Sequence, residues 1–300
     1  MNDDARYPDG VGFTWGETET VVWLAGPDGG YKKIAPELLE ALQDLATGER
    51  QFDELSEEAR EAIRHLEDEA YVTPGGAVTR HETPAPVRVG PRVALFVAAF
   101  VVVTGVVLAQ LLGVLPGPEP NGSGALGQTA VAIAVLVVLT LCHEGGHYLA
   151  ARPYFKPGIR VTLINWVFPA IVTQTNDAWR CPRSVRIWIN IAGPLVDALL
   201  TVSLAAVYVL VYPESVVLSV VVSLSFFRLV FAINPLIQGD GYWILVDWLG
   251  SVNLRRTGFT DLRDGKPTGP AAYAVCSVLF SLLGGVLLAY FAYQVATGLL

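Results

Sequence analysis

Hydrophobic and polar residues follow different patterns on the two sides of residue 90. Before it, short apolar stretches alternate with charged residues, whereas long apolar runs dominate after it. A helix that crosses a hydrocarbon core of about 30 Å needs about 20 apolar residues, and five runs reach that length. We expect a polytopic α-helical membrane protein with spans at 93–114, 127–150, 188–212, 216–237 and 271–297.

We expect the polar region, residues 1–89, to form a small α+β domain that is separate from the membrane domain of residues 90–300. In residues 18–35, apolar and polar residues alternate on both sides of a Gly-rich turn, which predicts a hairpin. Apolar periodicity over 36–48 and 52–68 predicts two amphipathic helices. A second small hairpin is expected over 70–79, turning at two glycines, and this order of elements is winged-helix-like.

A β-branched apolar segment, Ile159–Thr173, lies between the second and third runs and is too short to span. We expect a strand or a re-entrant hairpin associated with the membrane surface. Backbone groups left unpaired in lipid cost several kcal/mol each, so this segment should face protein or a wet cavity.

Charge separates the same two regions. Residues 1–89 contain 19 acidic and 8 basic side chains, within a chain of net charge −8. An acidic domain repels phosphates, which argues against binding to nucleic acid. In the membrane domain, the loops 151–187 and 238–270 contain six and four basic residues, and 115–126 and 213–215 contain none. Because positive charge collects in cytosolic loops, we expect a multi-pass protein of the cell membrane with its N-terminus in the cytosol and its C-terminus outside.

The second run ends in the sequence HEGGH, residues 143–147. Residues four apart share one face of a helix, so His143 and His147 can both bind one Zn²⁺, while Glu144 can take a proton from an attacking water. A chance match is disfavoured because charged residues inside a membrane span are costly and usually functional.

A catalytic zinc site needs a third protein ligand. The fourth run ends in NPLIQGDG, residues 234–241, where proline and glycine interrupt the helix beside a carboxylate. We expect Asp240 to be that ligand, which requires the unwound segment to fold back toward the histidines or to sit in a cavity. The alternative is that Asp240 caps a helix at the membrane interface.

HEGGH followed by NPLIQGDG resembles the site-2 protease family of intramembrane zinc metalloproteases, and in particular its bacterial and archaeal branch of peptide zinc metalloproteases. The resemblance covers about residues 90–260 and includes the sequence AGP at 192–194 and DGYW at 240–243. It implies one Zn²⁺ ion bound by His143, His147 and Asp240.

The resemblance also implies that Glu144 acts as general base and then as general acid, and that Asn234 donates to the developing oxyanion. Asn234 has an alternative role as a hydrogen-bonding residue at a helix end before Pro235. This chain departs from the family in having Gly145 where a larger residue is usual and Asp197 where Asn is frequent. Two glycines in the metal helix cost about 1 kcal/mol each, so we expect another element to approach them closely.

Asp197 and Arg228 are ionisable residues at matching depths in neighbouring spans. We expect them to pair, which would lower the cost of both charges and dock one span on the other. The alternative is that Asp197 holds a zinc-bound histidine through its second ring nitrogen.

The polar domain resembles the PqqD-like peptide-recognition domains over about 70 residues. This implies peptide binding along its first hairpin; the alternative is a regulatory or stabilising domain.

The sequence as a whole therefore predicts an intramembrane zinc protease that cleaves a membrane-spanning or membrane-associated peptide or protein, captured by the strand at Ile159–Thr173. The alternative is a non-proteolytic membrane-binding or export-associated protein with a structural zinc site. Retention of a general base argues against that alternative.

Overall fold

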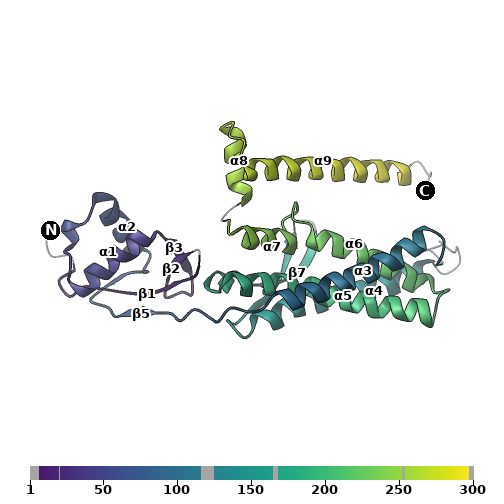
Figure 1. The fold of residues 1–300 in the computed structure, drawn as a ribbon, viewed down its shortest axis with the longest axis horizontal. Coiled ribbons are helices and arrows are strands. Elements are labelled where there is room, and N and C mark those ends of the chain that lie inside the picture. Colours follow the sequence, from purple (N-terminus) through teal and green to yellow (C-terminus); the bar gives the residue numbers. More distant parts are fainter. Residues whose placement is uncertain (1–6, 20, 116–124, 165–167, 252–253, 297–300) are drawn as a thin grey trace. The chain divides into compact units, whose positions relative to one another are not determined.

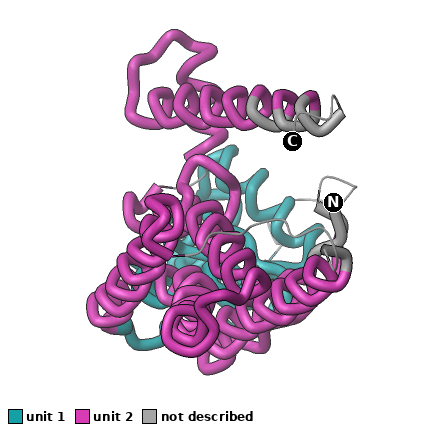
Figure 2. The backbone as a smooth tube through the Cα atoms, turned by 90° about the vertical axis from the view of Figure 1, so that its right-hand side faces the viewer, with its two compact units in different colours: residues 1–87, 176–185 teal, residues 88–175, 186–300 magenta. Residues whose placement is uncertain are grey.

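The computed structural model describes residues 7–19, 21–115, 125–164, 168–251 and 254–296. The chain forms two compact units, shown in different colours in Figure 2. Unit 1 comprises Met1–Val87 together with Asn176–Val185, and unit 2 comprises Arg88–Thr175 and Arg186–Leu300. Parts of the predicted segments and domains, at 1–6, 20, 116–124, 165–167, 252–253 and 297–300, lie outside the described residues.

Unit 1 is built around a sheet in the order β3-β2-β1-β4, with β5 also paired to β1 (Figure 1). The strands β2 (Val22–Ala25) and β3 (Tyr31–Ile34) form the predicted first hairpin, closed by the Gly26 N–H donating to the Gly30 carbonyl at 2.8 Å. The central strand β1 (Val11–Glu17) was not predicted.

The predicted second hairpin is wrong. The strands β4 (Thr73–Pro74) and β5 (Val78–Arg80) do not pair with each other; β4 runs antiparallel and β5 parallel to β1. The reason is the close approach of two glycines: a Cβ on Gly12 would lie 2.2 Å from the carbonyl carbon of Gly76. The turn that contains Gly76 therefore packs directly against β1, and both β4 and β5 pair with β1.

Two helices cover this sheet. The first, α1 (Pro36–Thr47), ends as predicted at Gly48, which adopts a left-handed φ of 74°. The predicted helix 52–68 is divided into a short 3₁₀ turn, η2 (Phe52–Glu54), and α2 (Glu57–Asp68), because the Ser56 side chain accepts the Ala59 N–H and starts a new helix. The core between sheet and helices includes Leu24, Leu42 and Ile63, which are fully buried.

Unit 1 also contains a segment from far along the chain. It includes the 3₁₀ helix η3 (Asn176–Arg180) and the start of α5. The Arg180 guanidinium lies 4.6 Å from the centre of the Tyr31 ring, and the Arg183 N–H donates to the Glu19 carboxylate at 3.1 Å. Residues distant in sequence thus complete the N-terminal unit.

In the part of the chain that the structure describes, five helices are long and apolar enough to cross a membrane. They are α3 (Gly90–Leu111), α4 (Ala125–Ala151), α5 (Arg183–Leu210), α6 (Val216–Ile233) and α9 (Gly269–Ala296). Each corresponds to one predicted span, which confirms a polytopic helical architecture. α6 packs against α3 and α4 (Figure 1) and ends at Ile233, four residues before the predicted end, because the chain unwinds before Pro235.

The predicted segment Ile159–Thr173 contains an antiparallel hairpin of β6 (Gly158–Ile164) and β7 (Phe168–Gln174). Val161 is opposite Ile171, and Ile159 is opposite Thr173. β7 packs against α4, so the hairpin contacts protein along this side, while Ile159 and Val161 of β6 are exposed.

Two short helices, α7 (Asp240–Leu249) and α8 (Leu254–Arg263), connect α6 to α9. The loop before α7 is attached to α9 by two hydrogen bonds: the Tyr273 hydroxyl donates to the Pro235 carbonyl at 3.0 Å, and the Ser277 hydroxyl donates to the Leu236 carbonyl at 2.9 Å. These bonds satisfy carbonyls that the unwound chain cannot pair within a helix.

Candidate metal centre

The helix α4 presents both histidines of the HEGGH sequence on one face. The Nε2 atoms of His143 and His147 are 3.1 Å apart, as expected for residues four apart in a helix. His147 is buried and His143 is partly buried. The two imidazoles therefore face one common point inside unit 2.

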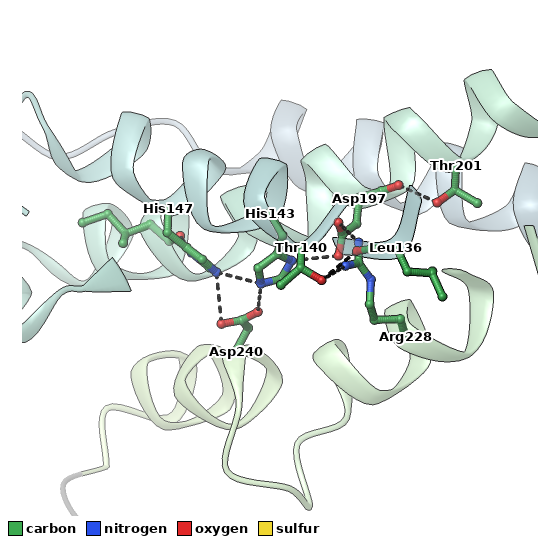
Figure 3. A network of polar contacts seen from close by, with 9 residues as sticks. Leu136, Thr140, His143, His147, Asp197, Thr201, Arg228 and Asp240 are labelled. Carbon is green, nitrogen blue, oxygen red and sulfur yellow. Dashed lines mark hydrogen bonds and ion pairs between the residues drawn. The ribbon is translucent and has the colours of Figure 1, made fainter. Parts of the chain in front are cut away.

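Asp240 lies at that point (Figure 3). Its carboxylate oxygens are 3.2 Å from His143 Nε2 and 3.3 Å from His147 Nε2. Burial raises the pKa of the Asp240 carboxyl, but hydrogen bonds from the two histidines and their charges, which act when the imidazoles are protonated, lower it more, to about 2. The three side chains form a group that could hold a metal ion.

The chain reaches this position by folding back after α6. Asp240 is the first residue of α7, and its neighbour Gly241 lies directly against the end of α6. A Cβ on Gly241 would be 2.2 Å from the Ile233 carbonyl oxygen, so a larger residue cannot make this reversal. The fold-back on which an Asp240 ligand depends is therefore present.

The second ring nitrogen of each histidine is also bonded. His147 Nδ1 is 2.7 Å from the Ile189 carbonyl oxygen, and His143 Nδ1 is 2.7 Å from Asp197 Oδ2. A carbonyl oxygen only accepts, so the hydrogen of the neutral His147 ring lies on Nδ1. The Asp197 carboxylate likewise accepts the Nδ1 hydrogen of His143. When both rings are neutral, each Nε2 therefore has a lone pair directed at the shared point, which is the tautomer that a metal ligand needs.

Asp197 makes both of the contacts that the sequence presented as alternatives (Figure 3). One carboxylate oxygen holds His143, and the other pairs with the Arg228 guanidinium. Arg228 also donates to the Thr140 hydroxyl at 2.8 Å, on the helix that carries the histidines. Asp197 is only 1% exposed, so its charge depends on these partners.

Glu144 contacts the hairpin. Its Oε2 accepts the backbone N–H of Thr173 at 2.6 Å, and the Thr173 hydroxyl donates to the Glu144 carbonyl at 2.9 Å. These two bonds fix β7 beside the metal helix and orient the carboxylate through one of its oxygens.

Asn234 ends α6, and its side-chain oxygen accepts the Leu236 N–H at 2.9 Å. The structure therefore shows the helix-end hydrogen bond that was the alternative for this residue. A donor role toward an oxyanion would use its amide nitrogen and stays a prediction.

Two glycines provide room for the histidine helix against α5. A Cβ on Gly146 would lie 2.8 Å from the Ala192 carbonyl oxygen, and one on Gly193 would lie 2.3 Å from His147 Nε2. The expected close approach is thus found at Gly146. At Gly145 the space is open.

Sequence reasoning did not identify three contributors to this centre: Ile189, Thr173 and Thr140. Ile189 acts through its backbone carbonyl, which every residue has, so the side chain at this position gives no sign of the contact in the sequence. Thr173 and Thr140 are hydroxyl residues in apolar segments, which is a weak signal because such hydroxyls commonly bond to nearby backbone, as the Thr140 hydroxyl also does to the Leu136 carbonyl.

Models of protein families, curated proteins and solved structures were compared with this chain, and none matches. The resemblances to site-2 proteases and to PqqD-like domains therefore rest on the sequence motifs and stay predictions.

Replacing Gly193 with Ala tests whether this glycine makes room for a ligand. Because the added methyl would overlap His147 Nε2, we expect Gly193→Ala to bind metal at least about tenfold more weakly. Gly145→Ala is the matched control, since the same methyl meets open space. Chelator competition on the purified protein measures the affinity; equal values for both variants would contradict this packing.

Removing the Asp197 carboxylate tests its hold on His143. We expect Asp197→Ala to weaken metal binding by about 10- to 100-fold, because His143 loses the acceptor that fixes its ring. Thr201→Val is the control, because the Thr201 hydroxyl donates to the backbone carbonyl of Asp197 and not to its carboxylate. A metal affinity that is unchanged in Asp197→Ala would show that the His143 contact is dispensable.

Proposed function

We propose that the protein is a zinc-dependent intramembrane protease that hydrolyses a peptide bond of a membrane-spanning or membrane-associated substrate. One observation carries the proposal: His143 and His147 meet Asp240 around one point, and both histidines lie with Glu144 on α4, a helix long and apolar enough to cross a membrane. A metal-ligand group beside a general base at that location suits hydrolysis within the bilayer.

The donor set fits zinc. Two neutral imidazole nitrogens and one carboxylate oxygen are common ligands of catalytic Zn²⁺. Ligand atoms about 2.1 Å from a tetrahedral ion are about 3.4 Å from one another. Here the two Nε2 atoms are 3.1 Å apart, and the Asp240 carboxylate approaches His143 with Oδ2 at 3.2 Å and His147 with Oδ1 at 3.3 Å. With one ligand atom taken from each residue, all three atoms lie within 4.8 Å of one another.

Bound zinc would polarise the scissile carbonyl and lower the pKa of a water toward 7. Glu144 would accept the proton of that water and pass it to the leaving amine. Asn234, through its amide nitrogen, would donate to the oxygen that gains negative charge. Asp197 and the Ile189 carbonyl would keep the two imidazoles in the required tautomer throughout.

The alternative is a non-proteolytic membrane-binding or export-associated protein with a structural zinc site. Structural zinc sites usually have four protein ligands. Among the residues that the structure describes, this group has three, which suits a site with a position for a substrate. A carboxylate that follows directly after the ligand His143 also suits a general base, which a structural zinc site does not need, and this favours the protease.

The variant Glu144→Gln separates the two functions. A carboxamide keeps the size of Glu144 but cannot accept the proton, so we expect cleavage of a membrane-anchored peptide to fall by about a thousandfold with zinc content unchanged. Glu214→Gln, in the short loop before α6, is the control and should cleave normally. If the wild type and Glu144→Gln bind the peptide equally well and the wild type does not cleave it, the alternative is favoured.

We propose that the substrate backbone pairs with the free edge of β6. Within the described residues, β6 pairs with β7 alone. The Thr173 N–H points away from β6 to Glu144, so its partner Ile159 and the equivalent Val161 direct their own N–H groups outward from the hairpin. An unwound substrate, whose carbonyls no longer bond within a helix, could accept from this edge.

Val161→Pro removes an outward N–H without removing a bond of the β6–β7 ladder. We expect peptide cleavage to fall by about tenfold or more with zinc retained, because the edge loses a donor. Val161→Ala, which keeps the N–H and removes most of the side chain, should cleave at close to the wild-type rate. Similar rates for the proline variant and the wild type would exclude this edge as the docking strand.

For localisation we propose a multi-pass protein of the cell membrane with its N-terminus in the cytosol. The positive charge of the loops 151–187, before α5, and 238–270, after α6, supports this orientation. Unit 1 would then lie in the cytosol, where the resemblance of its sequence to PqqD-like domains suggests that it binds a peptide.

A further inference from the structure

The helix α7 carries a second acidic residue, Asp247, with a buried partner. Arg186 Nε donates to Asp247 Oδ1 at 2.6 Å, and both residues are only 5% exposed. Asn190 lies 3.5 Å from the other carboxylate oxygen. Arg186 and Asn190 lie on α5, so this ion pair joins α5 to α7.

Asp247 is seven residues after Asp240, the first residue of the same helix. Seven residues make nearly two turns, so both carboxylates lie on one face, about 10.5 Å apart along the axis. α7 is bounded by Gly239 and Gly250, which permit backbone conformations that would let a short helix rotate. A bond at Asp247 fixes that rotation and, with it, the direction in which Asp240 points.

The helix α5 also bonds to both histidines of α4 and positions them. Arg186, Asn190, Gly193 and Asp197 are spaced by four, three and four residues, which places them on one face of α5. Along this face, Asp197 bonds His143, and Gly193 with the Ile189 carbonyl accommodates His147. The face that positions both imidazoles is therefore the one that receives Asp247.

Burying two charges is costly, and an apolar pair of similar size often stabilises a protein equally well. A directional ion pair differs from apolar packing in that it specifies one orientation of the joined helices. At this position, the specified orientation is that of the helix carrying Asp240.

We propose that Arg186 and Asp247 form a positioning pair that directs Asp240 to the two histidines. The proposal rests on the proposed function only in that His143, His147 and Asp240 bind zinc. Arg186 and Asp247 are not members of the ligand group, and they act by setting the rotation and position of α7 relative to α5.

The test compares zinc affinity and Co²⁺ spectra of the full-length protein. We expect Arg186→Met and Asp247→Asn each to bind zinc about tenfold or more weakly, measured by chelator competition. The visible spectrum of bound Co²⁺ should also change, because one carboxylate ligand is displaced. Arg186→Lys keeps the charge without the Nε donor and should have an intermediate affinity; it also serves if the Met variant does not fold.

Gln110→Leu is the matched control. Gln110 is buried in α3 and bonds to Ser219 and Ser223 of α6, so its loss removes a buried contact between helices away from the metal centre. We expect a lower melting temperature with unchanged zinc affinity and Co²⁺ spectrum.

The outcomes separate the two proposals. If the wild type binds zinc and the Arg186 and Asp247 variants resemble Gln110→Leu, with lower stability but unchanged affinity and spectrum, the pair is only a structural contact and the inference is overturned. If the wild type binds no zinc, both the metal centre and the positioning role are overturned. Weaker zinc binding and altered Co²⁺ spectra in both variants, with the control unaffected, support the inference.

Discussion

The candidate metal centre depends on one requirement of apolar surroundings: every buried polar group needs a partner. An imidazole that ligates through Nε2 must place its Nδ1 hydrogen on an acceptor. The helix α5 meets this requirement for both histidines, with the Asp197 carboxylate for His143 and the Ile189 carbonyl for His147. Asp197 in turn has its charge balanced by Arg228 of α6. The chemistry of the centre and the packing of the spans are therefore consequences of the same bonds.

The third side chain reaches the centre by a different route. α6 stops at Ile233, and the chain reverses over Gly241 so that α7 begins beside the histidines. The exposed carbonyls of this reversal are bonded from α9 by Tyr273 and Ser277. Irregular backbone beside membrane-spanning helices is thus covered by protein donors, as the absence of water in lipid demands. The break in the helix delivers a carboxylate to a place that a continuous helix would pass by.

Much of this could be predicted from local patterns. Apolar length identifies the five spans, and the four-residue spacing of the histidines places them on one face, since both follow from the geometry of a single helix. The strands β4 and β5 were mispredicted because their partner, β1, lies about 60 residues earlier and local pairing was assumed. Asp197 was treated as having one partner, although a carboxylate has two oxygens and uses each separately here. The Arg186 and Asp247 pair joins residues 61 positions apart, and no local pattern signals it.

The segment Asn176–Val185 has a consequence for the modular organisation of the chain. It belongs to unit 1, yet it is inserted between β7 and the rest of α5 in unit 2. The polypeptide consequently passes from one unit to the other three times, after residues 87, 175 and 185. Removal of residues 1–87 would take away the Tyr31 ring that Arg180 contacts. The ten residues 176–185 would then remain without the rest of unit 1, two residues after β7, the strand that bonds Glu144. The two units are therefore interlaced in sequence, and the N-terminal one is no detachable appendage.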